Sequence, residues 1–240
     1  MQSIRTLLSA AVICAGLSPG CRDVDAIVLE NAFYSCLDAD ETIEHARLSG
    51  VPDACRREIY SAEFDGPPPE EWGGRNTSRF AYGTLDGRYV LRVNSDVSLY
   101  RPVRLSELEA TADYDLEYRY RGSFPEERSG VGVLFGGREG ISFVHEILIS
   151  GNGEVSYQRL EDRNVVSVDS AIASSPSFAD GREHTLVLRR VAARTLVFID
   201  GDLIYERDDL EFRGHEVGVH ATTAGTIRLD RFAAYGLLGS

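Results

Sequence analysis

The chain of 240 residues contains no lysine, one methionine and one tryptophan, and only four cysteines and five histidines. All of its basic residues are arginines, a bias typical of a GC-rich genome that points to no mechanism. The formal net charge is -13. A chain this acidic has no electrostatic reason to bind nucleic acid or anionic lipid, so neither partner is expected.

The sequence patterns of several catalytic and metal-binding classes are also missing. The histidines form no His-x-His pair and no pair four residues apart, the spacings that place two ligands on one zinc ion. No Gly-x-Ser-x-Gly elbow and no phosphate-binding Walker loop occur. We therefore expect no metal and no cofactor, and we expect each histidine to lie at a strand edge or a turn.

The first twenty residues have the features of a secretory signal peptide. Arg5 supplies the positive charge, and Thr6 to Leu17 form an apolar stretch of the usual length. This stretch is too short to span a bilayer, which needs about 20 apolar residues, and no later segment is long enough. We expect residues 1–20 to be removed and the protein to be secreted or held in the cell envelope, in the periplasm or on the outer membrane.

The junction after the signal resembles a bacterial lipobox, in which a small residue precedes a cysteine that becomes lipid-modified. Here that cysteine is Cys21, but the leucine stands one place too early and Pro19 intrudes. We predict lipidation of Cys21, which would be the protein's only attachment to a membrane. The alternative is ordinary cleavage near Gly20 and release of the protein.

Residues 21–63 differ in character from the rest of the chain. Arg22 to Glu71 hold 13 acidic residues against 4 arginines, and their apolar residues recur at helical spacing. We expect residues 21–63 to be helical, with a short helix from Pro52 to Glu58. Cys36 and Cys55 would form a disulfide in an oxidising compartment. The region would be a spacer between domain and membrane or, alternatively, a small recognition subdomain.

From about Arg79 onward the apolar pattern changes to a period of two. Asp113 to Arg121 alternates without a fault, which predicts a buried Tyr/Leu face and a solvated charged face. Similar runs follow, separated by turns rich in Gly, Asp and Asn, at 130–135, 142–150, 154–160, 184–191, 195–199, 216–221 and 226–235. Many short strands at regular spacing predict an all-β sandwich over residues 64–240.

The stretch TLVFIDGDLIY, Thr195 to Tyr205, could hold either a metal site or a tight turn. Asp200-Gly201 between two apolar runs favours a β-hairpin, because a type I′ turn needs positive φ at both central residues. A metal site would need more oxygen ligands nearby, and no calcium-loop spacing is present. We expect the hairpin.

Six segments carry motifs that together resemble one known architecture. They are the DGRY opening in Phe80–Val93, SGVGVLF at Ser129–Phe135, FVHEILI at Phe143–Ile149, the segment Arg189–Gly201, and the closing strands Val217–His220 and Ile227–Phe232. These segments resemble strands of the concanavalin A-like jelly roll, and the motifs are specific for the architecture and weak for function. The resemblance covers about Phe64 to Leu237 and is close to bacterial secreted domains of the laminarinase and laminin G-like superfamily, including the 3-keto-disaccharide hydrolase domain.

The resemblance implies chemistry or binding at glycans. Laminarinase-type hydrolases carry a Glu-x-Asp-x-x-Glu strand whose two carboxylates flank the scissile bond. The matching strand here offers Glu146 alone, followed by Ile147-Leu148-Ile149. That departure argues against a retaining glycosidase of this kind, and we expect the protein not to be an enzyme.

A lectin-like protein needs a concave sheet with aromatic and polar side chains, because sugar rings stack on aromatic faces and polar groups read their hydroxyls. The candidate ligand-binding residues are Arg119, Glu146, Tyr157 and Arg159. The single tryptophan, Trp72, is expected to pack in the core. So are the alternating tyrosines Tyr114, Tyr118 and Tyr120.

Three functions stay open. The favoured one is a non-catalytic cell-envelope protein whose lectin-like jelly roll binds a glycan or another surface ligand. The second is a glycan-processing hydrolase of the 3-keto-disaccharide hydrolase type, which would need an acidic cluster open to solvent in the sheet's groove. The third is a structural or assembly module with an envelope protein as partner, whose groove would be filled by the chain's own side chains.

Overall fold

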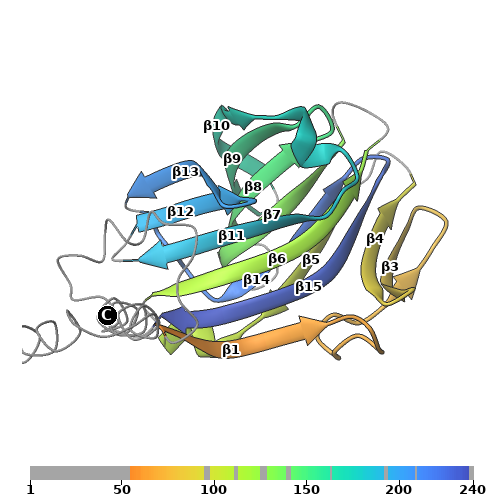
Figure 1. Cartoon of the computed structure of the whole chain (residues 1–240), viewed down its shortest axis with the longest axis horizontal. Coiled ribbons are helices and arrows are strands. Elements are labelled where there is room, and N and C mark those ends of the chain that lie inside the picture. Colours follow the sequence, from red (N-terminus) through yellow and green to blue (C-terminus); the bar gives the residue numbers. More distant parts are fainter. Residues whose placement is uncertain are drawn as a thin grey trace, which may run out of the picture.

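The computed structural model describes residues 55–94, 98–110, 113–124, 129–138, 142–162, 164–191, 194–208 and 210–237. They form two antiparallel sheets packed face to face (Figure 1). This arrangement confirms the predicted all-β sandwich. Within this part of the chain, no helix is long and apolar enough to cross a membrane.

The larger sheet, which we call sheet A, has nine strands in the order β13-β12-β11-β6-β15-β4-β3-β2, with β1 paired to the C-terminal part of β15. Figure 1 shows its long central strands, β11, β6 and β15, side by side. The bounds are β1 Arg56–Glu63, β2 Arg75–Asn76, β3 Phe80–Leu85, β4 Arg88–Val93, β6 Tyr114–Ser123, β11 His184–Val191, β12 Arg194–Ile199, β13 Asp202–Asp208 and β15 Gly225–Leu237.

The smaller sheet, which we call sheet B, has six strands in the order β10-β9-β8-β7-β14-β5. Two short 3₁₀ helices, η2 and η4, join strands at its margins. The bounds are β5 Leu99–Arg104, η2 Ser106–Ala110, β7 Gly130–Arg138, β8 Phe143–Ser150, β9 Glu154–Glu161, β10 Asn164–Ser174, η4 Pro176–Ala179 and β14 Glu216–Thr222.

The hydrophobic core lies between the inner faces of the two sheets. Tyr114, Tyr118 and Tyr120 are buried there, as the alternation along β6 predicts. Trp72 is fully buried, and its indole N–H donates to the hydroxyl of Tyr60 at 2.9 Å. These positions confirm that the tryptophan and the three tyrosines are core residues, because a strand with a period-two pattern turns one whole face inward.

The expectation of helix up to residue 63 is wrong for its last segment. Arg56–Glu63 form β1, which pairs antiparallel with β15 and lies along it in Figure 1. Tyr60 and Ala62 stand opposite Ala234 and Phe232, so they share the inner face of sheet A. From Tyr60 onward inward residues alternate with Ser61 and Glu63, and pairing with β15 satisfies the backbone groups of the strand.

The remaining predictions for the N-terminal region concern residues outside the described part of the chain. These are the signal at 1–20, lipidation of Cys21, the helical spacer and the partner cysteine Cys36. Cys55 is described and is buried just before β1. The disulfide between Cys36 and Cys55 therefore stays a prediction.

The hairpin at Asp200-Gly201 is confirmed. These two residues join β12 to β13 and both have positive φ, 52° and 92°. The Asp200 carboxylate accepts hydrogen bonds from the backbone N–H of Thr185 at 2.9 Å and contacts Nδ1 of His184 at 2.7 Å. Its side chain therefore ties the turn to the neighbouring strand β11.

Candidate functional site

Four side chains form a line across the outer face of sheet B, which we call the sheet B row. They come from separate strands because alternate residues of each strand point outward. In β14, for example, Val217 and Val219 are part of the core, so His220 points to the opposite face. The members of the row are Tyr100 on β5, His220 on β14, Glu146 on β8 and Gln158 on β9.

The carboxylate of Glu146 is the centre of the sheet B row. Its side chain is fully buried. Oε1 lies 2.5 Å from Nδ1 of His220, and Oε2 accepts a hydrogen bond from the amide of Gln158. The imidazole of His220 in turn stacks on the ring of Tyr100, with centroids 3.8 Å apart. One buried acid thus holds both flanking polar groups in fixed positions.

The tautomer of His220 follows from these contacts. A carboxylate can only accept, so Nδ1 of His220 carries the hydrogen that points to Glu146. That leaves Nε2 as the second polar atom of the ring. Nε2 is buried and has no hydrogen-bond partner among the described residues.

Gly132 makes the contact between Glu146 and His220 possible. It lies on β7, the strand between β8 and β14, directly opposite His220. A Cβ at this position would stand 1.6 Å from Oε1 of Glu146, well inside any real contact. The glycine therefore leaves the gap through which the glutamate side chain crosses β7.

Apolar side chains surround the centre of the row on the same outer face. Leu134, Val144 and Leu160 are buried together, and Tyr100 packs against them. Tyr100 and Gln158, at the two ends of the row, are only half-buried. The centre of the face is therefore filled, and Glu146 is not an acid open to solvent.

Tyr157 points the other way from the sheet B row, into the core. Its hydroxyl lies 2.8 Å from Nδ1 of His145, whose Nε2 lies 2.9 Å from the carbonyl oxygen of Glu211. The carbonyl can only accept, so Nε2 carries the hydrogen and Nδ1 accepts from Tyr157. Burial raises the pKa of Tyr157 to about 12 and lowers the pKa of His145 to about 4, which keeps both groups neutral.

The four predicted ligand-binding residues do not meet at one site. Glu146 lies on the outer face of sheet B, whereas Tyr157 and Arg159 lie on its inner side, opposite Ile147 and His145 of β8. Arg159 is partly exposed and pairs with Glu161 at 3.4 Å. Arg119 lies on the outer face of sheet A, on the far side of the sandwich.

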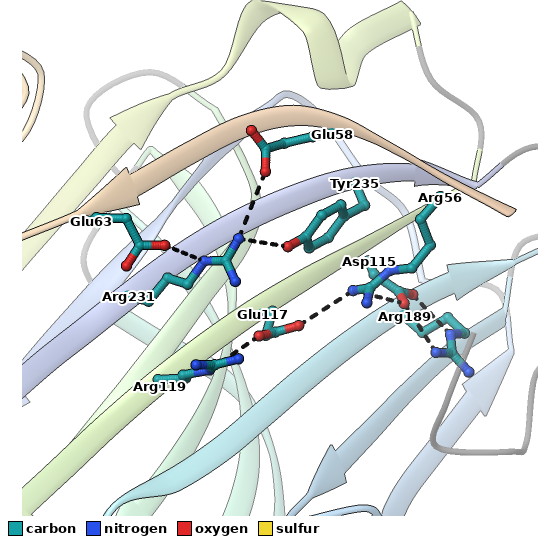
Figure 2. Close-up of polar contacts among 9 residues, drawn as sticks. All are labelled: Arg56, Glu58, Glu63, Asp115, Glu117, Arg119, Arg189, Arg231 and Tyr235. Carbon is teal, nitrogen blue, oxygen red and sulfur yellow. Dashed lines mark hydrogen bonds and ion pairs between the residues drawn. The ribbon is translucent and has the colours of Figure 1, made fainter. Parts of the chain in front are cut away.

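The outer face of sheet A carries a chain of ion pairs, shown in Figure 2. Arg189 binds Asp115 through two hydrogen bonds, of 2.8 and 3.0 Å. Arg56 lies 3.6 Å from Asp115 and 3.4 Å from Glu117, and Arg119 lies 3.4 Å from the other oxygen of Glu117. The expected solvated charged face is thus wrong for Asp115, which is fully buried because two guanidinium groups replace its water.

A second group of ion pairs lies beside the first in Figure 2. Arg231 on β15 contacts Glu63 at 2.7 Å, Glu58 at 3.7 Å and the hydroxyl of Tyr235 at 3.0 Å. The Arg56 guanidinium sits over the Tyr235 ring, 3.9 Å from its centroid, and connects the two groups. The two groups together contain four arginines and four acids. They form an ion-pair network that connects β1, β15, β6 and β11.

Sequence reasoning missed most of the sheet B row. Histidines were expected at edges or turns, which is wrong for His145 and His220 on the interior strands β8 and β14. The alternation of β14 did contain the signal, because it separates His220 from the core valines. Among the described residues, no three His, Cys, Asp or Glu side chains are grouped so as to hold a metal ion.

Comparison with known proteins identifies the fold but no family. No protein-family model matches the chain, and no curated protein matches it. The Emp47p carbohydrate recognition domain matches with a TM-score of 0.52 and 12% identity, over 79% of this chain and 100% of that one. SCLam, a non-specific endo-β-1,3(4)-glucanase from family GH16, matches with a TM-score of 0.52 and 13% identity, over 78% and 97%.

A third solved structure is the CBM2 module of the evolved Dit protein of Lactobacillus casei BL23 phage J-1. It matches with a TM-score of 0.51 and 10% identity, over 77% of this chain and 97% of that one. Identities this low bear on the fold alone. The chain has the concanavalin A-like jelly-roll fold that the sequence motifs resemble.

Proposed function

We propose that this jelly roll belongs to a non-catalytic protein of the cell envelope that binds a glycan on the outer face of sheet B. The fold supports a glycan as ligand, because solved structures that share it include the Emp47p carbohydrate recognition domain and the CBM2 module of the phage Dit protein. The sheet B row carries the proposal. It presents an aromatic ring and an amide, both partly exposed, at the two ends of one fixed line.

Each member of the row has a role in this proposal. The ring of Tyr100 supplies apolar surface for a sugar ring. Gln158 donates one amide hydrogen to Glu146, which leaves its second hydrogen and its carbonyl for sugar hydroxyls. Glu146 and His220 are positioning residues, because they fix the amide and the aromatic ring without reaching solvent.

The state of Glu146 supports a binding protein over a hydrolase. Glycoside hydrolysis by two carboxylates needs one group to act as acid and another to act as nucleophile or base, on either side of the bond. Glu146 is fully buried, and both of its oxygens already accept hydrogen bonds. It is therefore committed to holding its neighbours.

The envelope location and the lipid anchor at Cys21 belong to the same proposal. They rest on the signal-like start of the chain and the lipobox resemblance. The expected result is that the protein partitions into detergent on Triton X-114 extraction of the source cells. A Cys21→Ala variant should move to the aqueous phase, and partitioning that Cys21→Ala does not change would refute the anchor.

A second candidate function is a structural or assembly module. One observation favours it: Leu134, Val144 and Leu160 fill the centre of the outer face of sheet B with the chain's own side chains. A face that is already filled has less room for a sugar. The partner would then be another envelope protein.

Isothermal calorimetric titration with a glycan that the wild-type protein binds tests the proposal. Tyr100→Ala and Gln158→Ala should each weaken binding about tenfold, since each removes a ligand contact worth roughly 1–2 kcal/mol. Arg119→Ala is the matched control, because this side chain lies on the other sheet and should leave the affinity unchanged. A loss of binding in Arg119→Ala alone would contradict the proposed face.

A further inference from the structure

A cavity of about 200 Å³ lies at one end of the sandwich, away from the sheet B row. Both sheets contribute to its walls, with Tyr114 and Arg190 from sheet A and Val217 from sheet B. The segment before β14 closes it with Phe212, Arg213, Gly214 and His215. Neither the proposed glycan face nor the ion pairs of Figure 2 use these side chains.

Arg190 is an arginine on the inner face of a core strand. Along β11 it follows Leu186 and Leu188, which are both fully buried in the core. Its neighbours on the flanking strands are Tyr114 of β6 and Thr195 of β12. The side chain is therefore directed between the sheets, where its guanidinium lies 4.2 Å from the centroid of the Phe212 ring.

Arg190 has no anionic partner in this position. Among the described residues its Nε is buried without a hydrogen-bond partner, while its guanidinium hydrogen-bonds to the hydroxyl of Tyr114, which is neutral rather than anionic. The hydroxyl of Thr195, on the same inner face, is also buried without a partner. Buried polar groups normally have partners, because leaving them unsatisfied costs free energy.

The preceding residue provides a direct comparison. Arg189 points to the opposite face of the same strand and holds Asp115 through two hydrogen bonds. The fold thus supplies a carboxylate to the outward guanidinium and none to the inward one. The inward site is where an anion from outside the chain would complete the same kind of pair.

The charge around the cavity has the sign that an anion needs. The nine described residues that line it include Arg190, Arg213 and His215 and no aspartate or glutamate, in a chain with a net charge of -13. Of these cations, Arg213 is paired with Glu211 at 3.0 Å, outside the lining. A neighbouring cavity of about 190 Å³ shares Arg213 and His215 and adds Arg104 and Arg138, with one acid, Glu216. Positive charge is therefore concentrated at this end of an acidic protein.

We propose that this cavity binds a small oxyanion, the carboxylate or phosphate group of a small ligand, on the guanidinium of Arg190. The planar fork of arginine matches either group through two parallel hydrogen bonds. The volume suits a single sugar acid or a similarly small phosphate better than a larger ligand. The site does not involve the sheet B row and does not depend on the glycan proposal.

Calorimetric titration of the full chain with glucuronate, inorganic phosphate and glucose tests the site. Glucuronate, phosphate or both should bind, with an affinity that falls as NaCl is added. Glucose, which lacks the charge, should not bind. The two anions tell whether a carboxylate or a phosphate is preferred, and failure of both to bind would overturn the proposal, as would equal binding of glucose and glucuronate.

Variants locate the site. Arg190→Gln should lower the anion affinity about tenfold or more, since it removes charge-assisted hydrogen bonds. Arg228→Gln is the matched control, because it removes one positive charge from an exposed position on β15 and should leave the affinity unchanged. If Arg190→Gln does not fold, Arg190→Lys keeps the charge, loses the fork and should still bind several-fold more weakly. Wild-type affinity in a folded Arg190 variant would overturn the assignment.

Discussion

Glu146 and His220 are 74 residues apart in the chain, yet Oε1 of the glutamate lies 2.5 Å from Nδ1 of the histidine. The contact crosses β7 at Gly132 and joins three neighbouring strands of sheet B on its outer face. The contact therefore keeps a carboxylate and an imidazole together in a buried position, where each would otherwise lack a polar partner. The stability of the protein and its dependence on pH should depend on this contact and on the buried contacts of Asp115 and His145.

Gly132→Ala should destabilise the protein by about 3 kcal/mol. The added methyl group would overlap Oε1 of Glu146, so the glutamate must move and lose its bond to His220. The free energy of unfolding in urea measures the effect. Gly66→Ala is the control, because nothing lies within 4 Å of a Cβ there, and it should be neutral or slightly stabilising. Equal stability of the two variants would contradict the proposed role of Gly132.

Asp115→Ala should cost about 3–5 kcal/mol of unfolding free energy. It leaves the buried guanidinium of Arg189 without its carboxylate, in a place where water does not compensate. Glu183→Ala removes an exposed partner of Arg121 and should cost less than about 1 kcal/mol. Chemical denaturation of both variants makes the comparison. The prediction fails if the two losses are of similar size.

The stability of the protein should fall in mild acid because of His145. Burial lowers the pKa of His145 from 6.5 to about 4. The hydrogen bond to the Glu211 carbonyl opposes this shift, and the positive charges of Arg159 and Arg207 add to it. The unfolded chain therefore takes up a proton below about pH 6.5, while the folded protein does not until about pH 4. This contribution is present above pH 6.5, and roughly 3 kcal/mol is lost between pH 6.5 and 4.

Urea titrations at several pH values isolate this effect when wild type is compared with His145→Gln. The variant loses the hydrogen bonds to Tyr157 and Glu211 and should be less stable at neutral pH. Its stability should, however, change less than that of wild type between pH 6.5 and 4. Parallel curves for the two proteins would show that His145 does not contribute to the pH dependence.

The interior strands could be predicted from sequence because apolar residues recur at every second position and point to the core. In β6, Tyr114 to Tyr120 alternate with charged residues, and the Asp200-Gly201 turn fixes the end of β12. The edge strands of sheet B, β5 and β10, were missed. β5 contains Pro102, which argues against a central strand, and an edge strand has only one neighbour to impose a pattern.

The site could be predicted only in part, because its geometry depends on contacts between distant strands. Resemblance singled out Glu146, but nothing near it in sequence indicates that it binds His220 and Gln158. Tyr157 lies two residues after Val155, on the same face of β9, and that spacing alone assigns it to the core. Asp115 shows the same limit, since alternation gives the face on which it lies but not the arginine from β11 that buries it.

The most direct measurement is a glycan-array screen of the protein without its predicted signal, repeated with Tyr100→Ala and Arg119→Ala. The account predicts specific binding to one class of glycan that Tyr100→Ala weakens and Arg119→Ala leaves intact. Binding that survives Tyr100→Ala would show that the ligand lies elsewhere than the sheet B row. No binding to any glycan would contradict the lectin-like function and favour the assembly module.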